Sequence, residues 1–290
     1  MSEFYAGRAA CQLKGATFLI PSVFCDTVAL FSLALIASTS DTTMSSIHSG
    51  SGERVPIFRY HRIGPHDGCG LNRRAAELSR RLTVSPDCFG FQMWLMAKLG
   101  YRTISMDELA DGVESGCLPR KRFVVSFDDG YADFHEHALL ILERYGFTAI
   151  IYLVASQIGG TDRWDEGLGF PLKPLLSWDQ IRSMAGRGVE FGSHTCSHAR
   201  LTTLDDGRLR DEIALSRSML EEGLQRPVRH FCYPYGAHDA QVIEAVKAAG
   251  FRTAVTTAKG WVKTGASLLA QPRVKVSRTL QFILDLVFRY

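Results

Sequence analysis

The feature that most constrains the fold is a regular alternation of short apolar strands with helix-like segments from Arg54 onward. Runs rich in β-branched residues predict buried strands, and apolar residues three and four positions apart predict helices between them. Strands that alternate with helices form βα units and a parallel sheet. Six or seven such units in ~235 residues favour a single α/β barrel over an open sheet, although periodicity alone does not decide closure.

The expected elements follow one another closely along the chain. Strands are expected at 55–61, 103–105, 123–127, 148–154, 189–193, 228–233, 251–256 and 274–277. Helices are expected at 88–99, 106–113, 131–145, 177–184, 202–224, 239–249 and 280–288. Residues 62–87 are polar and rich in glycine, so a loop is expected there.

The first 53 residues differ in composition from the rest. Thr27 to Ala37 is an apolar run that resembles the hydrophobic region of a signal peptide or signal anchor. It is shorter than the ~20 residues that a spanning helix needs. A natural start at Met44 is the alternative. We expect a non-barrel segment over 1–53 and one domain over 54–290. The protein would be exported or membrane-anchored if 1–43 are genuine, with membrane contact only through an anchor, and cytoplasmic if translation starts at Met44.

Composition excludes some functions. The chain has 290 residues, 46% hydrophobic and 22% charged, which is enough for one large core. A formal net charge of +3 is too small to indicate nucleic-acid binding. The seven cysteines are odd in number and include no Cys-x-x-Cys pair, which favours free thiols over a disulfide framework.

Two adjacent carboxylates end one of the buried strands. Phe123 to Phe127 is apolar, and Asp128, Asp129 and Gly130 follow it directly. In α/β folds, catalytic groups collect where a strand gives way to a helix. Asp-Asp-Gly is also ordinary turn chemistry. Two like charges side by side are costly unless they share a cation or a proton, so this pair is a candidate site.

A pair of histidines follows another strand. His194 and His198 are four residues apart, and in a helical turn both would share one face. Cys196 would then point away. Such a pair alone is usually a surface feature. Together with a strand-end carboxylate, it predicts a site with two histidines, one carboxylate and an open position, as catalytic metal sites require.

The motifs in order resemble the polysaccharide deacetylases, the NodB-homology family also called carbohydrate esterase family 4. The resemblance is carried by Ser126–Gly130, His194-x-x-x-His198 and Phe231–Gly236. Tyr60-His61-Arg62-Ile63 and Gly100-Tyr101-Arg102 are similar to the branch of exopolysaccharide poly-N-acetylglucosamine and chitooligosaccharide deacetylases. The resemblance covers about Val55 to Val276 and implies a distorted (β/α)7, TIM-like barrel.

The resemblance also implies roles for single residues. Asp128 would be the general base, and Asp129, His194 and His198 would bind a divalent metal, commonly Zn²⁺. The backbone N–H of Tyr235 would face the developing oxyanion, with Pro234 and Tyr235 shaping the wall of the substrate groove.

The sequence departs from the family pattern in two places. Cys232 stands where members often carry an arginine that steadies the base, and the aspartate partner in the fourth motif is missing. Arg273 is the candidate replacement, although it could be a surface arginine. No histidine follows His238, so the usual late acid is absent. We expect His61 as the general acid in preference to His230 and His238. Trp261 is a candidate wall of the acetyl pocket.

These observations predict a metal-dependent hydrolase that removes acetyl groups from N-acetylglucosamine units of an oligo- or polysaccharide. Two alternatives stay open: a non-catalytic carbohydrate-binding relative, and a hydrolase of a non-sugar amide on the same barrel. The expected partner is an N-acetylated glycan. The sequence predicts neither the glycan's identity nor the oligomeric state.

Overall fold

The computed structural model describes residues 8–13, 16–21, 54–65, 71–167 and 171–276. The chain divides into two compact units, Met1–Ser51 and Gly52–Tyr290. In the first unit, β1 (Arg8–Leu13) and β2 (Ala16–Pro21) pair as an antiparallel hairpin, which the sequence analysis did not expect. The apolar run 27–37 and the expected terminal helix 280–288 lie outside the described residues.

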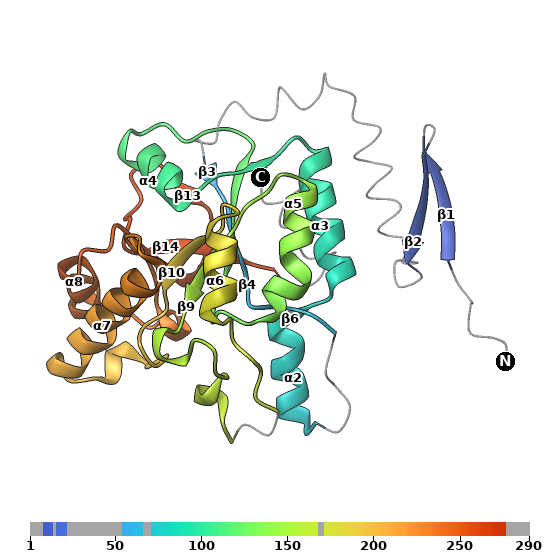
Figure 1. Cartoon of the computed structure of the whole chain (residues 1–290). Coiled ribbons are helices and arrows are strands. Elements are labelled where there is room, and N and C mark those ends of the chain that lie inside the picture. The colour runs from blue at the N-terminus through green and yellow to red at the C-terminus, as the bar shows by residue number, and fades with distance from the viewer. Residues whose placement is uncertain (1–7, 14–15, 22–53, 66–70, 168–170, 277–290) are drawn as a thin grey trace. The chain divides into compact units, whose positions relative to one another are not determined.

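A closed parallel barrel forms the second unit (Figure 1). Its strands, in order around the barrel, are β4 (Ile57–Tyr60), β8 (Arg122–Phe127), β9 (Ile150–Leu153), β10 (Glu190–Ser193), β11 (His230–Cys232), β12 (Thr253–Lys259) and β14 (Gln271–Lys275). All seven neighbouring pairs are parallel, and pairing of β4 with both β8 and β14 closes the ring. The expected (β/α)7 barrel is confirmed.

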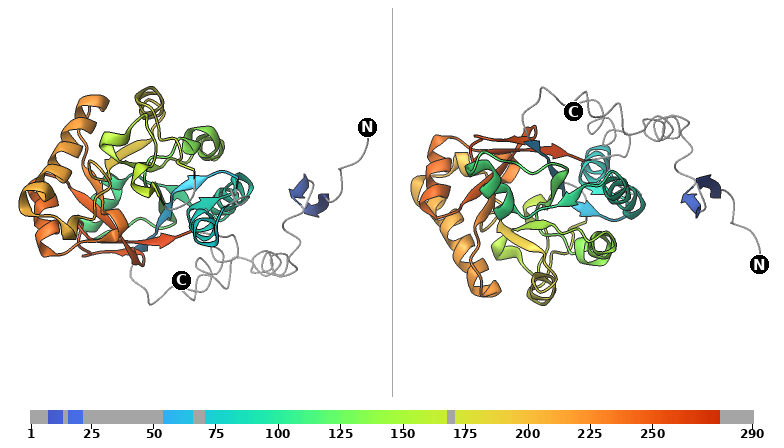
Figure 2. Two further views of the ribbon diagram at one scale, coloured as in Figure 1. Left: turned by 90° about the horizontal axis from the view of Figure 1, so that it is seen from below. Right: turned by 90° about the horizontal axis from the view of Figure 1, so that it is seen from above.

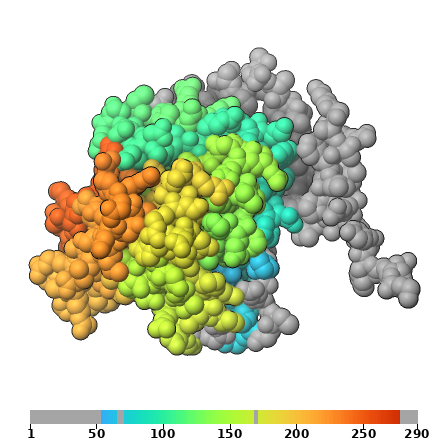
Figure 3. Space-filling view, in the orientation of Figure 1, coloured from blue at the N-terminus to red at the C-terminus, as the bar shows by residue number. Residues whose placement is uncertain are grey.

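Helices surround the strands, as the two views along the barrel show (Figure 2). They are α2 (Arg73–Leu82), α3 (Pro86–Lys98), α4 (Met106–Glu114), α5 (Leu139–Arg144), α6 (Trp178–Ala185), α7 (Asp206–Leu224) and α8 (Ala240–Ala248). Ser85, Ser105, Ser177, Asp205 and Asp239 cap helices by accepting a backbone N–H, which explains where those helices begin. On the face shown in Figure 3, α5, α6 and α7 cover the strands.

Short strands complete the described structure. β7 (Arg102–Thr103) pairs with the start of β8, β3 (Arg54–Val55) pairs with β13 (Val262–Lys263), and β5 (Arg62–Ile63) pairs with β6 (Thr83–Val84). No helix among the described residues is long and apolar enough to span a membrane.

The buried side chains form two separate cores, because successive strand residues point to opposite faces. Phe58, Val125, Ile151 and Phe231 belong to the larger core, between the strands and the surrounding helices. The smaller core is inside the barrel and includes inward residues such as Ile57, Val124 and Tyr152. Residues of α4 join this inner core, so α4 closes the amino-terminal end of the barrel, called the floor below.

Two expectations about local structure were wrong. Residues 62–87 contain β5, α2 and β6 rather than a loop alone. Asn72 caps α2, whose arginine, alanine, glutamate and leucine residues are good helix formers. Its apolar residues Ala75, Leu78 and Leu82 recur at helical spacing among the charges. The helix expected over 131–145 begins as a π-helix, Phe134–Ala138, before α5. π-turns often lie near functional sites.

Candidate active site

The two aspartates lie at the carboxyl end of β8, on the mouth of the barrel. Asp128 and Asp129 are 3% and 5% exposed. Asp129 has φ 74° and Gly130 has φ 78°, so the chain turns sharply there. A Cβ on Gly130 would lie 2.8 Å from Leu153 Cδ2, and only glycine fits this turn comfortably. The turn leaves the two carboxylates directed at different partners.

Asp129 faces both histidines. Its Oδ1 lies 3.4 Å from His194 Nε2 and 3.4 Å from His198 Nε2. All three side chains are buried, and their ligand atoms lie within 4.8 Å of one another. Two imidazole nitrogens that converge on one buried carboxylate oxygen are a donor set that suits a divalent transition metal. The residues present therefore fit a metal ion.

The histidines converge by a route other than the expected helical turn. Residues 194–198 follow β10 without forming a helix. Thr195 has φ 67° and His198 has φ 66°, and the Thr195 hydroxyl accepts the His198 N–H at 2.9 Å. Cys196 lies away from the site, with its Sγ 3.9 Å from Met219 Sδ.

Backbone strain is concentrated at this site. Six non-glycine residues in the described structure have positive φ, and four of them are Asp129, Thr195, His198 and Tyr235. Residues in this region cost free energy and persist where the surrounding contacts hold them. The strained backbone therefore lowers the stability of the fold somewhat, and it orients these side chains toward the site.

Hydrogen bonds orient the two imidazoles. His194 Nδ1 lies 2.7 Å from the Cys232 carbonyl oxygen and donates to it, which orients Nε2 toward Asp129. His198 Nδ1 lies 3.1 Å from the Tyr235 hydroxyl. Burial would raise the pKa of Asp129, but hydrogen bonds with His194 and His198 lower it well below its usual range.

Asp128 is held by Arg273 instead. Nη1 and Nη2 of Arg273 donate to Oδ1 and Oδ2 of Asp128 at 2.6 and 2.8 Å, a bidentate geometry. Nε of Arg273 donates to the Thr256 carbonyl oxygen at 2.9 Å, and Nη2 lies 3.3 Å from Cys232 Sγ. Arg273 thus occupies the space beside Cys232, although it comes from β14 and follows Cys232 by 41 residues.

This pairing keeps the base ionised. Burial alone would raise the pKa of Asp128, but the charge of Arg273 and its hydrogen bonds outweigh burial and lower the pKa well below the usual range. Burial would lower the pKa of Arg273, and the Asp128 charge raises it instead. At neutral pH the pair is therefore a carboxylate and a guanidinium.

His61 also lies at the mouth, next to Asp128. Its Nε2 is 3.9 Å from Asp128 Oδ2, and its side chain is 17% exposed. Burial lowers the pKa of His61 to about 4, against the opposing charges of Asp129 and Asp128. The ring is therefore neutral at pH 7 before a reaction begins. His230 lies at the floor, 3.8 Å from Asp107, and His238 bonds to the Gly236 carbonyl oxygen.

Tyr235 and Pro234 lie at the same mouth. Pro234 is buried in the short 3₁₀ turn Pro234–Gly236, and the Tyr235 side chain is 48% exposed. The Tyr235 ring packs edge-on to His198 at 4.7 Å, and the Arg200 guanidinium lies 4.5 Å from the Tyr235 ring centroid. Tyr235 has φ 61°, in the left-handed region, so the backbone of this turn is strained.

Trp261 lies elsewhere. Its ring contacts Arg54, whose Cζ is 5.9 Å from the ring centroid. Arg54 is in β3, seven residues before His61 along an extended segment, a span of roughly 20 Å. The expected role of Trp261 as a wall of the acetyl pocket is therefore not supported by its position. The residue is part of the larger core.

Trp164 and Asp165 are mouth residues that the sequence analysis missed. The Trp164 ring stacks on His198 with centroids 4.6 Å apart and an interplanar angle of 28°. Burial raises the pKa of Asp165 to about 6, and the charges of Asp129 and Asp162 act in the same direction. Both residues belong to the short 3₁₀ turn Arg163–Asp165 after β9. An aromatic next to an acid in a polar loop was the only signal, and it has no periodicity.

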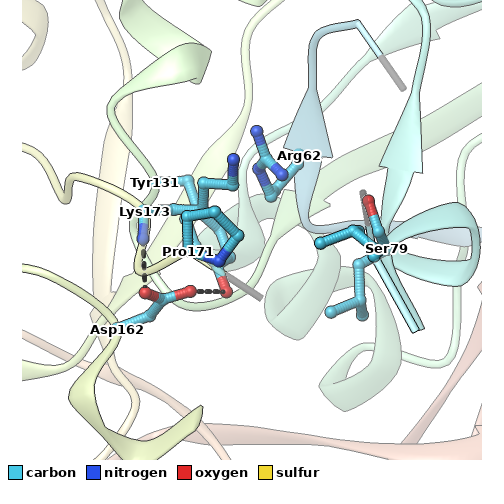
Figure 4. Close-up of a pocket in the computed structure, with 8 residues that line it drawn as sticks. Arg62, Ser79, Tyr131, Asp162, Pro171 and Lys173 are labelled. Atoms are coloured by element: carbon cyan, nitrogen blue, oxygen red, sulfur yellow. Dashed lines mark hydrogen bonds between the residues drawn. The ribbon is translucent and has the colours of Figure 1, made fainter. Parts of the chain in front are cut away.

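A pocket opens beside Tyr131, two residues after Asp129 (Figure 4). Tyr131 donates its hydroxyl to Asp162 at 3.1 Å, and the Lys173 N–H donates to the other Asp162 oxygen. Arg62 lies over the Tyr131 ring at 5.6 Å. Ser79 and Leu82 of α2 form part of the opposite wall. The pocket is therefore built between α2 and the loop that carries Trp164.

The comparison with known families covers the two aspartates and both histidines. Residues 115–254 match the polysaccharide deacetylase family, a span that runs from the end of α4 into β12 and contains Asp128, Asp129, His194 and His198. Over just under half of its length, the chain is therefore similar to the polysaccharide deacetylases. It is a hydrolase of carbon–nitrogen bonds other than peptide bonds, as the sequence analysis expected.

Individual relatives and solved structures agree with this similarity. A poly-β-1,6-N-acetyl-D-glucosamine N-deacetylase of Staphylococcus epidermidis is 24% identical over 270 residues, which cover 84% of this chain and 90% of that protein. A Streptococcus pyogenes deacetylase structure has a TM-score of 0.68 at 22% identity, over 82% of this chain and 98% of that one. A Bacillus cereus polysaccharide deacetylase structure has a TM-score of 0.64 at 25% identity, over 80% and 69%.

Proposed function

We propose that this polysaccharide deacetylase removes acetyl groups from N-acetylglucosamine units of a glycan, with a divalent metal, Zn²⁺ for preference, bound by Asp129, His194 and His198. The observation that carries the proposal is the division of labour between the adjacent aspartates. Asp129 faces two imidazoles, whereas both carboxylate oxygens of Asp128 accept hydrogen bonds from Arg273. One carboxylate is thus available as a ligand and the other as a base.

An acetamide is a poor electrophile, so its hydrolysis needs help at both the carbonyl and the water. A metal ion at this site would supply Lewis acidity, which polarises the amide carbonyl and makes water more acidic. Asp128 stays ionised beside it and takes the proton from the attacking water. The Tyr235 backbone N–H, on the strained 3₁₀ turn, would donate to the developing oxyanion.

The departing amine must then be protonated. His61 is neutral at rest and lies 3.9 Å from the carboxylate oxygen that becomes protonated. We infer that His61 receives this proton from Asp128 and passes it to the amine nitrogen. The proton that leaves the water thereby ends on the glucosamine, and acetate carries the added oxygen.

The mouth also offers places for sugar rings. Aromatic faces stack on the apolar faces of sugars, and Trp164 and Tyr235 flank His198 on two sides. The pocket beside Tyr131 lies next to the same site and would hold a neighbouring unit of the polymer (Figure 4). Poly-β-1,6-N-acetylglucosamine is a reasonable first substrate, given the Staphylococcus epidermidis relative.

The test is acetate release from N-acetylglucosamine oligomers by the full chain loaded with Zn²⁺, with chelated protein as the control. The proposal expects release that is lost on chelation and restored by added metal. Binding of oligomers without acetate release by metal-loaded protein would favour the non-catalytic alternative. Release only from a non-sugar acetamide would favour the other alternative.

A further inference from the structure

Four cationic side chains gather near the mouth of the barrel and take no part in the steps above. They are Arg59, Arg81, Lys259 and Lys275, called the basic wall below. In the parallel pairing of β14 with β4, Lys275 stands opposite Arg59. In the pairing of β12 with β14, Lys259 stands opposite Arg273. Three neighbouring strands therefore each contribute one cation near their carboxyl ends.

Two of these cations point into the barrel mouth. Phe58 and Tyr60 flank Arg59, Val274 and Val276 flank Lys275, and all four flanking residues pack in the outer core. Because strand residues alternate between faces, Arg59 and Lys275 face the inside of the barrel. They lie there with Arg273, whose guanidinium holds Asp128.

The fourth cation of the wall, Arg81, comes from α2. Burial lowers the pKa of Lys275, and the nearby charges of Arg81, Arg59 and Lys259 lower it further, whereas Glu77 acts in the opposite direction. The helix carries four arginines and one glutamate, which gives a net charge of +3 (4 − 1) over ten residues. The helix therefore adds positive charge to this side of the wall.

Carboxylates act on the wall only without direct contact: the charges of Asp128 and Asp129 raise the pKa of Arg59, and the charge of Glu77 raises that of Lys275. Among the described residues, none of the four side chains forms an ion pair or a side-chain hydrogen bond, and Arg59 Nε is buried without a partner. Arg273 differs, because Asp128 neutralises it. Clustered cations repel one another and attract an anion, most strongly at Arg59 and Lys275, which are partly buried, whereas Arg81 and Lys259 are exposed.

We propose that the glycan substrate carries an anionic group, a carboxylate or a phosphate, that binds the basic wall while the N-acetyl group lies at Asp129, His194 and His198. This inference rests on the proposed deacetylase function and names its substrate class. A neutral N-acetylglucosamine polymer has no charge to place here. Its deacetylated product is cationic and is repelled by the wall, whereas an anionic group retains the attraction throughout the reaction.

The experiment compares three soluble substrates of the Zn²⁺-loaded full chain. They are a neutral N-acetylglucosamine oligomer, an oligomer in which N-acetylglucosamine alternates with glucuronic acid, and an N-acetylglucosamine oligomer that bears phosphate monoesters. At low ionic strength, kcat/KM for acetate release from one anionic substrate should exceed that for the neutral oligomer by about 10-fold. Added NaCl should reduce this ratio, because salt screens exposed charges. The anionic substrate with the higher kcat/KM shows whether the wall binds a carboxylate or a phosphate.

Charge-removing variants locate the effect. Lys275→Gln and Arg81→Gln should each reduce the anionic-to-neutral ratio of kcat/KM by about 2- to 5-fold, as expected for one partly exposed charge pair. Arg210→Gln is the matched control, because it removes one exposed cation from α7. The control should keep the ratio of the parent protein. Circular dichroism and thermal unfolding verify that each variant is folded.

The outcomes separate the two proposals. Acetate release from the neutral oligomer with no preference for either anionic substrate would overturn the basic wall and leave the deacetylase function standing. So would equal ratios in the parent, Lys275→Gln and Arg210→Gln proteins. Absence of acetate from all three substrates with metal-loaded protein would remove the deacetylase function, and the substrate class with it.

Discussion

The two ends of the barrel both place an arginine against carboxylates, but in different surroundings. At the mouth, Arg273 is 1% exposed and has a single carboxylate partner, Asp128. At the floor, the Arg252 side chain is 28% exposed and pairs with Asp107, Asp111 and Glu114. At the mouth, one buried ion pair has no second carboxylate to replace Asp128. At the floor, the charge of Arg252 is shared among several more exposed carboxylates.

The difference shows how the same interaction serves two purposes. Buried pairs cost much desolvation, so they contribute little net stability, yet loss of one partner leaves an uncompensated charge. Exposed pairs are individually worth at most about 1 kcal/mol. The floor network fastens α4 beneath the strands by many small contributions. The mouth pair fixes the ionisation and orientation of one reacting group.

Loss of a histidine ligand should have the largest effect at the mouth. His194→Ala or His198→Ala removes one of three converging donors, and we expect both variants to lose the stoichiometric metal and nearly all acetate release. Thermal unfolding should still be cooperative, because each histidine lies in a turn rather than a core. Metal analysis of the purified variants checks this. Full retention of the ion in both would exclude these residues as ligands. His238→Ala is the matched control.

Substitution of the two aspartates should have different effects on metal binding and on the rate. Asp128→Asn should keep the metal and lower the rate of acetate release about 10²- to 10⁴-fold, as loss of a general base does. Asp129→Asn should weaken metal binding instead. Metal titration and single-turnover rates on the two proteins distinguish the roles. Equal metal loss in both variants would contradict the division of labour.

A matched pair of arginine variants compares the two ends directly. Arg273→Met leaves Asp128 buried and unpaired, which should cost about 3–5 kcal/mol in the free energy of unfolding. Arg252→Met should cost about 1 kcal/mol. Urea unfolding at pH 7 measures both values. Adding Asp128→Asn to Arg273→Met should recover much of the loss, and similar costs at the two ends would refute the contrast.

His61→Ala should have a smaller effect on the rate, about 10²-fold, with the metal retained. The pKa of His61 is lowered to about 4, so the ring is protonated only below that pH. Its removal should therefore lower the plateau of the pH–rate profile without changing the shape above pH 5. A near-parent rate would assign proton delivery to another group.

The smallest effect is expected for Glu190 at the floor, where it accepts the Met106 N–H at 2.9 Å. Burial raises the pKa of Glu190 to about 7, and Asp107 and Glu108 act in the same direction. Its stabilising contribution is complete below the unfolded pKa and is lost as pH rises through about 7. The free energy of unfolding of Glu190→Gln, measured relative to that of the parent, should therefore increase by about 1–2 kcal/mol as the pH rises from 5 to 8. If the difference in unfolding temperature between the variant and the parent stayed constant from pH 5 to pH 8, this prediction would be wrong.

The sequence by itself determined the class of fold and most of its elements. Apolar periodicity is local, so the strand before Asp128 and the helix capped by Ser177 could be placed from neighbouring residues alone. The sequence also predicted which residues form the metal site, since Asp129, His194 and His198 each follow a strand. The helix α2 was missed, because four arginines dominate the segment and its apolar residues Ala75, Leu78 and Leu82 are few.

Tertiary structure decided which distant residues meet. Arg273 reaches Asp128 across 145 positions because β14 and β8 flank β4 in the closed ring. The same closure brought Arg59 beside Lys275 and separated Trp261 from the mouth. The turn from His194 to His198 depends on left-handed residues that only the surrounding contacts stabilise. Barrel closure and strained turns are long-range effects, and no local pattern in the sequence encodes them.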